Sequence, residues 1–229
     1  MVRSNGTKDR NKPKTPRAEL AEFFAVVRGL DSIDFEPRYN VAPTTPMICI
    51  RETDEGREAF TARWGLVPGW ARDKPSMSTF NARSDGISTK PMFRSAFKSR
   101  RCLVLASGFY EWHKVSAKQK QPYYITLKSG EPMAMAGLWE PYGDGDDLRE
   151  SCTICTTDAN PFMLKMHDRM PVILPPAMIE PWLNSEKKTA DELQPILSQF
   201  PGDQMQCWPV SSEVGNVRNK GEHLIEPVE

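Results

Sequence analysis

A single carboxylate, Glu111, lies inside the aromatic string GFYEW of residues 108–112. In a β-strand the side chains of Phe109 and Glu111 would point to the same face. A carboxylate buried there costs free energy unless it is hydrogen-bonded or keeps its proton at a higher pH. Such a group is suited to proton transfer, so Glu111 is a candidate general acid or base. A buried acid with a purely structural role is the alternative interpretation.

His167 offers a second proton carrier, at the start of the string HDRMP of residues 167–171. Imidazole has an unperturbed pKa of about 6.5, so it gains and loses protons near neutral pH. Placed beside a reacting group, His167 could therefore act as a proton shuttle. A hydrogen-bonded histidine with a structural role is the alternative.

Asn81 and Arg83 form a short polar string, Asn-Ala-Arg, whose side chains suit the positioning of a substrate. An amide can bind a hydroxyl group, and a guanidinium can bind a phosphate with two parallel hydrogen bonds. The string alone predicts a site for a phosphorylated or sugar-containing ligand. It does not identify that ligand.

Cations and tryptophans gather in the stretch that surrounds this string. Trp64 and Trp70 flank a Pro-Gly pair, and a basic cluster precedes the strand that carries Glu111. Single-stranded nucleic acid needs both features, because its phosphates meet the charges and its bases stack on the rings. A solvated basic face and two core tryptophans are the alternative. The basic cluster comprises Arg94, Lys98, Arg100 and Arg101.

The cysteines predict neither a metal site nor a redox site. Cys152 and Cys155 have the spacing of half a zinc site, but no second pair lies at a suitable distance. In a strand their sulfurs would face opposite sides. The five cysteines are odd in number and unpatterned, which favours reduced thiols. No glycine-rich phosphate loop or dinucleotide fingerprint occurs, so we expect no cofactor and no metal.

The composition is that of one ordinary globular domain. The 229 residues include 30 basic and 30 acidic side chains, so the formal net charge is zero and does not itself indicate a nucleic-acid-binding protein. No apolar run approaches the roughly 18 residues that a membrane helix needs. The charged N-terminal stretch has no apolar run behind it, so we expect no secretory signal peptide, no membrane association and a cytoplasmic location.

Hydrophobic patterning predicts a single α+β domain over residues 17–229, preceded by a mobile basic arm over residues 1–16. Thr15 and Pro16 could open a helix whose apolar residues extend to Val27. Polar turns between short apolar runs favour mainly antiparallel strands with a few peripheral helices. The predicted strands are 47–51, 60–67, 102–113, 123–127, 133–139 and 152–157, and the predicted later helices are 176–183 and 189–200.

Taken together, the strings resemble the SRAP domain family, the SOS response-associated peptidases. The resemblance covers about residues 18–227 and keeps the family's motif order. It rests on RYNVAP (38–43), WGLVPGW (64–70), NAR (81–83), GFYEW (108–112), HDRMP (167–171) and VGNV (214–217).

The resemblance implies a β-rich monomer that binds abasic sites in single-stranded DNA, near the nucleoid, and links covalently to them. It further implies that Asn81 positions the N-terminal residue and the sugar, that Glu111 assists formation of a Schiff base, and that His167 handles protons. The family is also described as autoproteolytic, which places the activity in the hydrolase or lyase class. The DNA-binding set that follows from the motifs and the basic cluster is Asn40, Pro43, Trp70, Arg83, Arg94, Lys98, Thr156, Arg169 and Asn216.

The sequence departs from the family at position 2, where Val2 stands in place of a cysteine. In the family the α-amine of that cysteine condenses with the opened sugar and its thiol closes a stable thiazolidine ring. Val2 offers an amine without a thiol, so its Schiff base would be hydrolysable. One alternative is therefore a catalytically impaired module that binds the lesion. A peptidase acting on other proteins is a third reading, which has no nucleophile in evidence.

Overall fold

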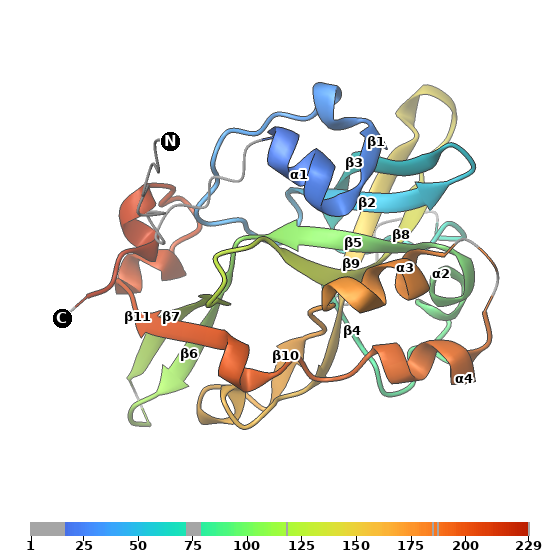
Figure 1. Cartoon of the computed structure of the whole chain (residues 1–229). Helices are drawn as coiled ribbons and strands as arrows, with labels where there is room; N and C mark the ends of the chain where they lie inside the picture. Colours follow the sequence, from blue (N-terminus) through green and yellow to red (C-terminus); the bar gives the residue numbers. More distant parts are fainter. Residues whose placement is uncertain (1–16, 72–78, 118, 185, 187, 229) are drawn as a thin grey trace, which may run out of the picture.

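Eleven β-strands form two sheets in the computed structural model, which describes residues 17–71, 79–117, 119–184, 186 and 188–228 (Figure 1). Seven of the ten strand pairings are antiparallel, which confirms the predicted α+β class with mainly antiparallel strands. The large sheet contains β1 (Val26–Arg28), β2 (Pro46–Thr53), β3 (Gly56–Trp64), β4 (Asn81–Arg83), β5 (Arg101–Ala106), β8 (Met133–Tyr142), β9 (Arg149–Asp158) and β10 (Arg169–Pro171). The small sheet contains β6 (Phe109–Lys114), β7 (Lys120–Leu127) and β11 (Met205–Pro209).

The large sheet curls so that two strands distant in the strand order, β3 and β9, pair with each other. Its order is β1-β3-β2-β5-β8-β9-β10, and β3 also pairs with β9 in parallel, at Trp64 and Cys152. Five strands therefore form a closed ring, β3-β2-β5-β8-β9. The short strand β4 joins β9 from outside this ring, which brings its side chains beside the end of β9.

Two apolar clusters lie on opposite faces of these strands. Cys49 and Val104 belong to one cluster, and their neighbours Ile50 and Leu103 belong to the other, as strand alternation requires. The same alternation separates Cys152 from Cys155, as predicted, and all five cysteines are free. Both faces are buried because four helices cover the outer cluster: α1 (Arg17–Phe24), α2 (Arg94–Ser99), α3 (Pro176–Leu183) and α4 (Ala190–Leu193).

The first helix ends earlier than its apolar spacing predicts. Helix α1 stops at Phe24, and Ala25 takes a left-handed backbone conformation with φ 52°. The chain then becomes β1, which pairs with β3, and Val27 is 65% exposed rather than part of a buried helical face. The prediction of one helix whose apolar residues extend to Val27 is wrong because pairing with a neighbouring strand overrides helical spacing. Thr15 and Pro16, with the predicted arm, lie outside the described residues.

The predicted strand over residues 102–113 is two strands in different sheets. Strand β5 belongs to the large sheet and β6 to the small one, and the chain crosses between them at Gly108. A Cβ atom at Gly108 would lie 2.5 Å from both the ring of Tyr124 and the carbonyl oxygen of Ile125. Only glycine allows this close approach, and the resulting crossing brings β6 to the edge of the small sheet.

The two later helices differ in how well they follow the prediction. Helix α3 has the predicted bounds. The predicted helix over residues 189–200 is shorter: α4 starts after the cap residue Thr189 and passes into a 3-10 turn, Gln194–Ile196, which contains Pro195. In the described residues no helix is long and apolar enough to cross a membrane.

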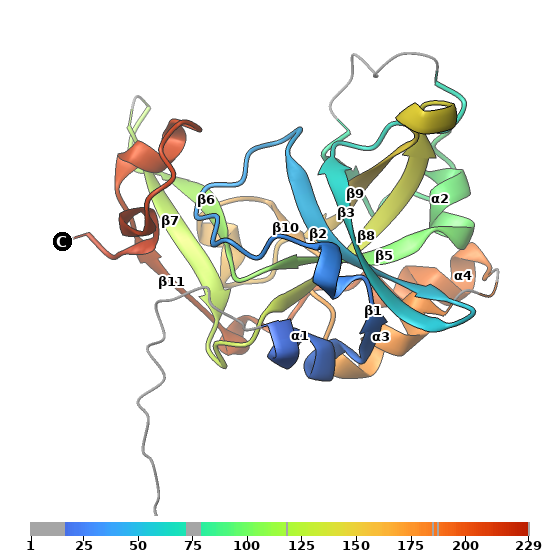
Figure 2. The ribbon, with the colours of Figure 1, turned by 90° about the horizontal axis from the view of Figure 1, so that it is seen from above.

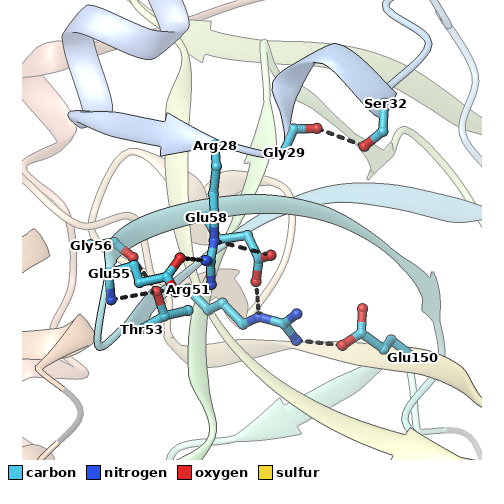
Figure 3. Close-up of polar contacts among 9 residues, drawn as sticks. All are labelled: Arg28, Gly29, Ser32, Arg51, Thr53, Glu55, Gly56, Glu58 and Glu150. Atoms are coloured by element: carbon cyan, nitrogen blue, oxygen red, sulfur yellow. Dashed lines mark hydrogen bonds and ion pairs between the residues drawn. The ribbon is translucent and has the colours of Figure 1, made fainter.

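A charged network centred on Arg51 of β2 connects neighbouring strands of the large sheet (Figure 3). The guanidinium of Arg51 donates to the carboxylates of Glu58, at 2.8 Å, and Glu150. It also lies over the rings of Phe60 and Trp139, with centroid distances of 4.3 and 4.5 Å. These contacts join β2, β3, β8 and β9, so the ring of strands is held by charge as well as by apolar packing.

Candidate active site and nucleic-acid interface

A cavity of about 950 Å³ opens between the two sheets. Its walls come from β4, β6, the end of β9, β10 and the segment 34–43 that leads into β2. Figure 2 shows this segment passing beside β6, and the C-terminal turns lying over the small sheet. The cavity brings together eight of the residues predicted for the site: Asn40, Pro43, Asn81, Arg83, Glu111, Thr156, His167 and Arg169.

Glu111 lies on β6, partly buried in the cavity wall. Burial raises the pKa of its carboxyl group above the ordinary value. His167 and the backbone N–H of Trp112 act in the opposite direction on that pKa, and Asp168 reinforces the rise. Phe109 and Tyr123 pack with the inner apolar cluster, which confirms that Phe109 and Glu111 share a face of the strand. The carboxyl therefore keeps its proton to a higher pH than an ordinary glutamate does.

His167 lies just before β10, with about half of its side chain exposed. Its Nδ1 accepts the backbone N–H of Arg169 at 2.9 Å. A neutral imidazole that accepts at Nδ1 carries its proton at Nε2. The same Nδ1 lies 3.0 Å from the Oδ1 of Asp168, which would stabilise the ring once it is protonated. Both protonation states of His167 thus have a partner at hand.

Arg169 joins three segments of the cavity wall. Its guanidinium donates to the carboxylate of Asp158 at 2.6 Å and to the backbone carbonyl of Thr156 at 2.7 Å, and it forms an ion pair with Asp85 at 3.1 Å. The side chain is only 14% exposed. Arg169 therefore fixes β10, which follows His167, and the loop after β4, which follows Asn81, against β9.

Asn81 and Arg83 are presented by the short strand β4. They pair with Ile154 and Thr156 of β9, and Ala82 between them is fully buried. Alternation then turns both polar side chains toward the cavity that they line. Among the described residues the guanidinium of Arg83 has no hydrogen-bond or ion-pair partner. It is free to bind an anion.

Asn40 holds the opposite wall. Its Nδ2 donates to the backbone carbonyls of Val214, Asn216 and Asn219 at 3.0–3.3 Å. The backbone carbonyl of Asn40 accepts a hydrogen bond from the ammonium group of Lys220. The buried amide thereby fixes the loop after β11 to the segment before β2.

Pro43 projects from a tight turn on the same wall. The next residue, Thr44, has a left-handed φ of 74°, and its N–H donates to the carbonyl of Trp64 at 2.8 Å. The hydroxyl of Thr45 donates to the carbonyl of Ala42 at 2.7 Å. These bonds hold a backbone conformation that non-glycine residues rarely adopt, and they fix the exposed Pro43 at the cavity rim.

Other predicted site residues do not line the cavity. Trp70 is 68% exposed, and Arg94 and Lys98 lie on α2, at the end of the molecule away from the small sheet (Figures 1 and 2). Asn216 lies between the lining residues Gly215 and Val217 without being one. Val2 lies outside the described residues.

Two members of the predicted basic cluster are used by the protein itself. Arg101 is buried, and its guanidinium donates to backbone carbonyls that include those of Trp182 and Phe97. Arg100 pairs with the buried carboxylate of Glu140 at 2.5 Å. Of the cluster, only Arg94 and Lys98, the two members assigned to the DNA-binding set, are exposed.

The sequence-based candidate set omitted several residues that line the cavity. Arg38 and Tyr39 stand directly before Asn40 in its motif, and Tyr110 and Trp112 flank Glu111. The sequence signal that could have found these residues is their position next to a predicted residue on the same strand or loop. In the residues that the structure describes, no group of three or more His, Cys, Asp or Glu side chains could hold a metal ion.

Comparison with known proteins gives a consistent result. A family model described as "SOS response associated peptidase (SRAP)" matches residues 10–217. The chain is 38% identical over 211 residues to the abasic site processing protein YoqW of Bacillus subtilis, covering 91% of this chain and 94% of that protein. It is 38% identical over 200 residues to the abasic site processing protein YedK of Escherichia coli, covering 85% and 87%.

A relative from an animal and a solved structure extend this result. The chain is 35% identical over 224 residues to the abasic site processing protein HMCES of Xenopus tropicalis, covering 82% of this chain and 65% of that one. A crystal structure of a Bacteroides thetaiotaomicron protein aligns with a TM-score of 0.72 and 29% identity, over 81% of this chain and 82% of that one.

Proposed function

The chain belongs to the SOS response associated peptidase (SRAP) family, and we propose that it binds abasic sites in single-stranded DNA and forms a covalent link to them through the amine of its N-terminal residue. The observation that carries this proposal is the convergence of a partly buried acid, Glu111, with His167, Asn81 and Arg83 in one cavity. The relatives named above are abasic site processing proteins, which agrees with it.

The cavity can hold a sugar with its phosphates. The guanidinium of Arg83 lies at its wall without a hydrogen-bond or ion-pair partner in the described part of the chain, and phosphate binding would satisfy it. The amide of Asn81, on the same face of β4, is placed to bind a sugar hydroxyl. Thr156 and Pro43 would border the strand on either side of the lesion.

The proposed chemistry is reversible imine formation. A neutral amine adds to the aldehyde of the opened sugar, and loss of one water molecule from the resulting carbinolamine gives the Schiff base. The departing hydroxyl needs a proton, which Glu111 can donate because burial raises its pKa. His167 can take a proton from the attacking amine and return it in the reverse reaction.

The second candidate is a lesion-binding module without durable chemistry. Val2 favours it, since an imine without a neighbouring thiol stays open to hydrolysis. Both candidates share DNA binding and differ in whether a covalent adduct forms.

Mass spectrometry separates them. The protein is mixed with single-stranded DNA that carries one abasic site, with and without borohydride, and the adduct is digested to locate the linked amine. The proposal predicts an adduct that borohydride traps at the N-terminal residue. Absence of an adduct under both conditions, with preserved preference for the abasic strand, would favour the binding module. No preference for the abasic strand would reject both.

A further inference from the structure

Glu111 and His167 reach the cavity from two different sheets. Glu111 lies on β6, the edge strand of the small sheet, and His167 directly precedes β10 of the large sheet. Among the described residues, no hydrogen bond or ion pair joins the two side chains to each other. Their relative position therefore depends on contacts that neighbouring residues make.

His113, two residues after Glu111 on β6, makes such a contact. Its Nδ1 lies 2.6 Å from the backbone carbonyl oxygen of Lys165, two residues before His167. A carbonyl oxygen only accepts hydrogen bonds, so Nδ1 carries a proton and is the donor. This bond connects the strand that bears the acid to the segment that bears the histidine.

The turn between Lys165 and His167 transmits this constraint. Lys165 ends the 3-10 turn Met163–Lys165, and the N–H of His167 donates to the carbonyl of Met163 at 3.0 Å. Met163 is fully buried, and its N–H donates to the side-chain oxygen of Asn160 at 2.9 Å. A shift of the Lys165 carbonyl would therefore move the backbone of His167 as well.

The ring of His113 is itself held on the side of β6 that carries Glu111. Strand alternation puts Phe109, Glu111 and His113 on one face. Glu111 lies opposite Tyr123 of β7, and the rings of His113 and Tyr123 meet edge to face, with centroids 6.3 Å apart and planes at 89°. This contact favours the ring orientation in which His113 donates to Lys165.

We propose that His113 is a positioning residue, whose hydrogen bond to the carbonyl of Lys165 holds His167 in place relative to Glu111. The inference rests on the proposed function, which assigns proton transfers to Glu111 and His167. His113 does not line the cavity, so it acts through the backbone that carries His167. Both groups must reach the same sugar, and a displacement of about 1 Å is enough to slow such a reaction strongly.

The test compares His113→Phe, His113→Asn and His223→Phe with the wild type. Phenylalanine keeps a ring against Tyr123 but has no donor, whereas the amide of asparagine supplies an N–H close to the place of Nδ1. His223→Phe is the matched control, because the Nε2 of His223 lies 3.1 Å from the carboxylate of Glu213 on the exposed C-terminal turns, outside the cavity lining.

Thermal unfolding checks that each variant is folded. If His113→Phe does not fold, His113→Val takes its place, since valine also lacks a donor and suits a strand.

Two quantities are measured for each protein. One is the rate at which borohydride traps the adduct at saturating abasic single-stranded DNA, and the other is the dissociation constant for a strand with a tetrahydrofuran analogue, which cannot open to an aldehyde. We expect His113→Phe to react about 10- to 100-fold more slowly than the wild type, with affinity nearly unchanged. His113→Asn should recover most of the wild-type rate, and His223→Phe should match the wild type.

A double-mutant cycle shows whether His113 acts through His167. In a His167→Gln background, His113→Phe should slow the reaction no further, because the group that it positions is absent. Equal fold-losses in both backgrounds would mean that His113 acts independently of His167, and would overturn the inference.

NMR of the imidazole rings tests the geometry without DNA. The chain has three histidines, so the substitutions assign each set of ring signals directly. His113→Phe should shift the ring signals of His167, His113→Asn should restore them, and His223→Phe should leave them unchanged. Unchanged His167 signals in folded His113→Phe would overturn the inference.

The kinetic measurements overturn the inference if folded His113→Phe reacts at the wild-type rate, if its rate and affinity fall together, or if His113→Asn does not rescue it. Failure of the proposed function has a different appearance. The wild type itself would then form no adduct with abasic DNA, with or without borohydride. That result would also reject the role of His113 in the reaction, even where the spectra show that it holds His167.

Discussion

Glu111 lies near enough to His167 for the imidazole to lower the pKa of the carboxyl, yet burial outweighs this influence and the pKa stays above its ordinary value. The two residues come from different sheets, on β6 and directly before β10. The small sheet therefore supplies the acid and the large sheet the proton acceptor, so the chemistry depends on how the two sheets meet.

The raised pKa of Glu111 predicts a specific pH dependence of stability. A carboxyl whose folded-state pKa is raised stabilises the fold at low pH, and this contribution is lost as the pH rises through the folded-state value. Glu111→Gln removes this loss of stability at higher pH, because glutamine does not ionise. We expect the variant to become more stable than the wild type as the pH rises above the ordinary range of a glutamate, and to converge with it at lower pH. Urea unfolding from pH 4 to pH 8 measures the difference, and parallel curves would contradict the assignment.

Arg83→Ala should weaken binding to single-stranded DNA and make it less sensitive to salt. One lost phosphate contact lowers the slope of log affinity against log salt by about 0.7. Lys128→Ala is the control, because Lys128 is exposed and does not line the cavity. An unchanged salt slope for Arg83→Ala would show that its guanidinium does not contact phosphate.

Asn40→Ala should destabilise the protein by about 1–3 kcal/mol. The substitution leaves the carbonyls of Val214, Asn216 and Asn219 without a buried donor. Chemical denaturation gives the free energy of unfolding, and Arg218→Ala, at an exposed residue nearby, serves as the control. A loss no larger than that of the control would mean that the amide is not needed to hold this loop.

Arg51→Met should cost about 1.5–3 kcal/mol of stability, the range for hydrogen bonds that involve charged groups. Methionine keeps the apolar contact with Phe60 and Trp139 but leaves Glu58 and Glu150 without their shared cation. High salt should reduce the difference only slightly, because the groups are mostly buried. If Arg51→Met were as stable as the wild type, water would have to satisfy the two carboxylates in place of Arg51.

Local sequence patterns located most strands and the motifs that supply the cavity walls. Alternation placed Phe109 and Glu111 on one face, and Cys152 and Cys155 on opposite faces, because a strand's period depends only on its backbone. The predicted end of the first helix failed at Val27, where pairing with β3 decides the conformation. The predicted single strand over residues 102–113 failed for a similar reason, since the crossing at Gly108 depends on a ring from β7.

Contacts between residues far apart along the chain could not be predicted from the sequence. Asn40 meets the carbonyl of Val214, 174 residues away along the chain, and no local pattern encodes that contact. The same holds for Arg101, which sequence proximity grouped with an exposed basic cluster and which the fold buries against Trp182. In such cases the tertiary fold determines which groups a side chain contacts.

The rate of adduct formation in Glu111→Gln is the sharpest test of whether this carboxyl donates the proton in the proposed chemistry. The adduct with abasic single-stranded DNA is trapped with borohydride at timed intervals, and affinity for the same strand is measured in parallel. We expect adduct formation about 10²- to 10⁴-fold slower than in the wild type, the usual contribution of general acid–base catalysis, with affinity nearly unchanged. A wild-type rate in this variant, or an equal loss of rate and affinity, would contradict the role assigned to Glu111.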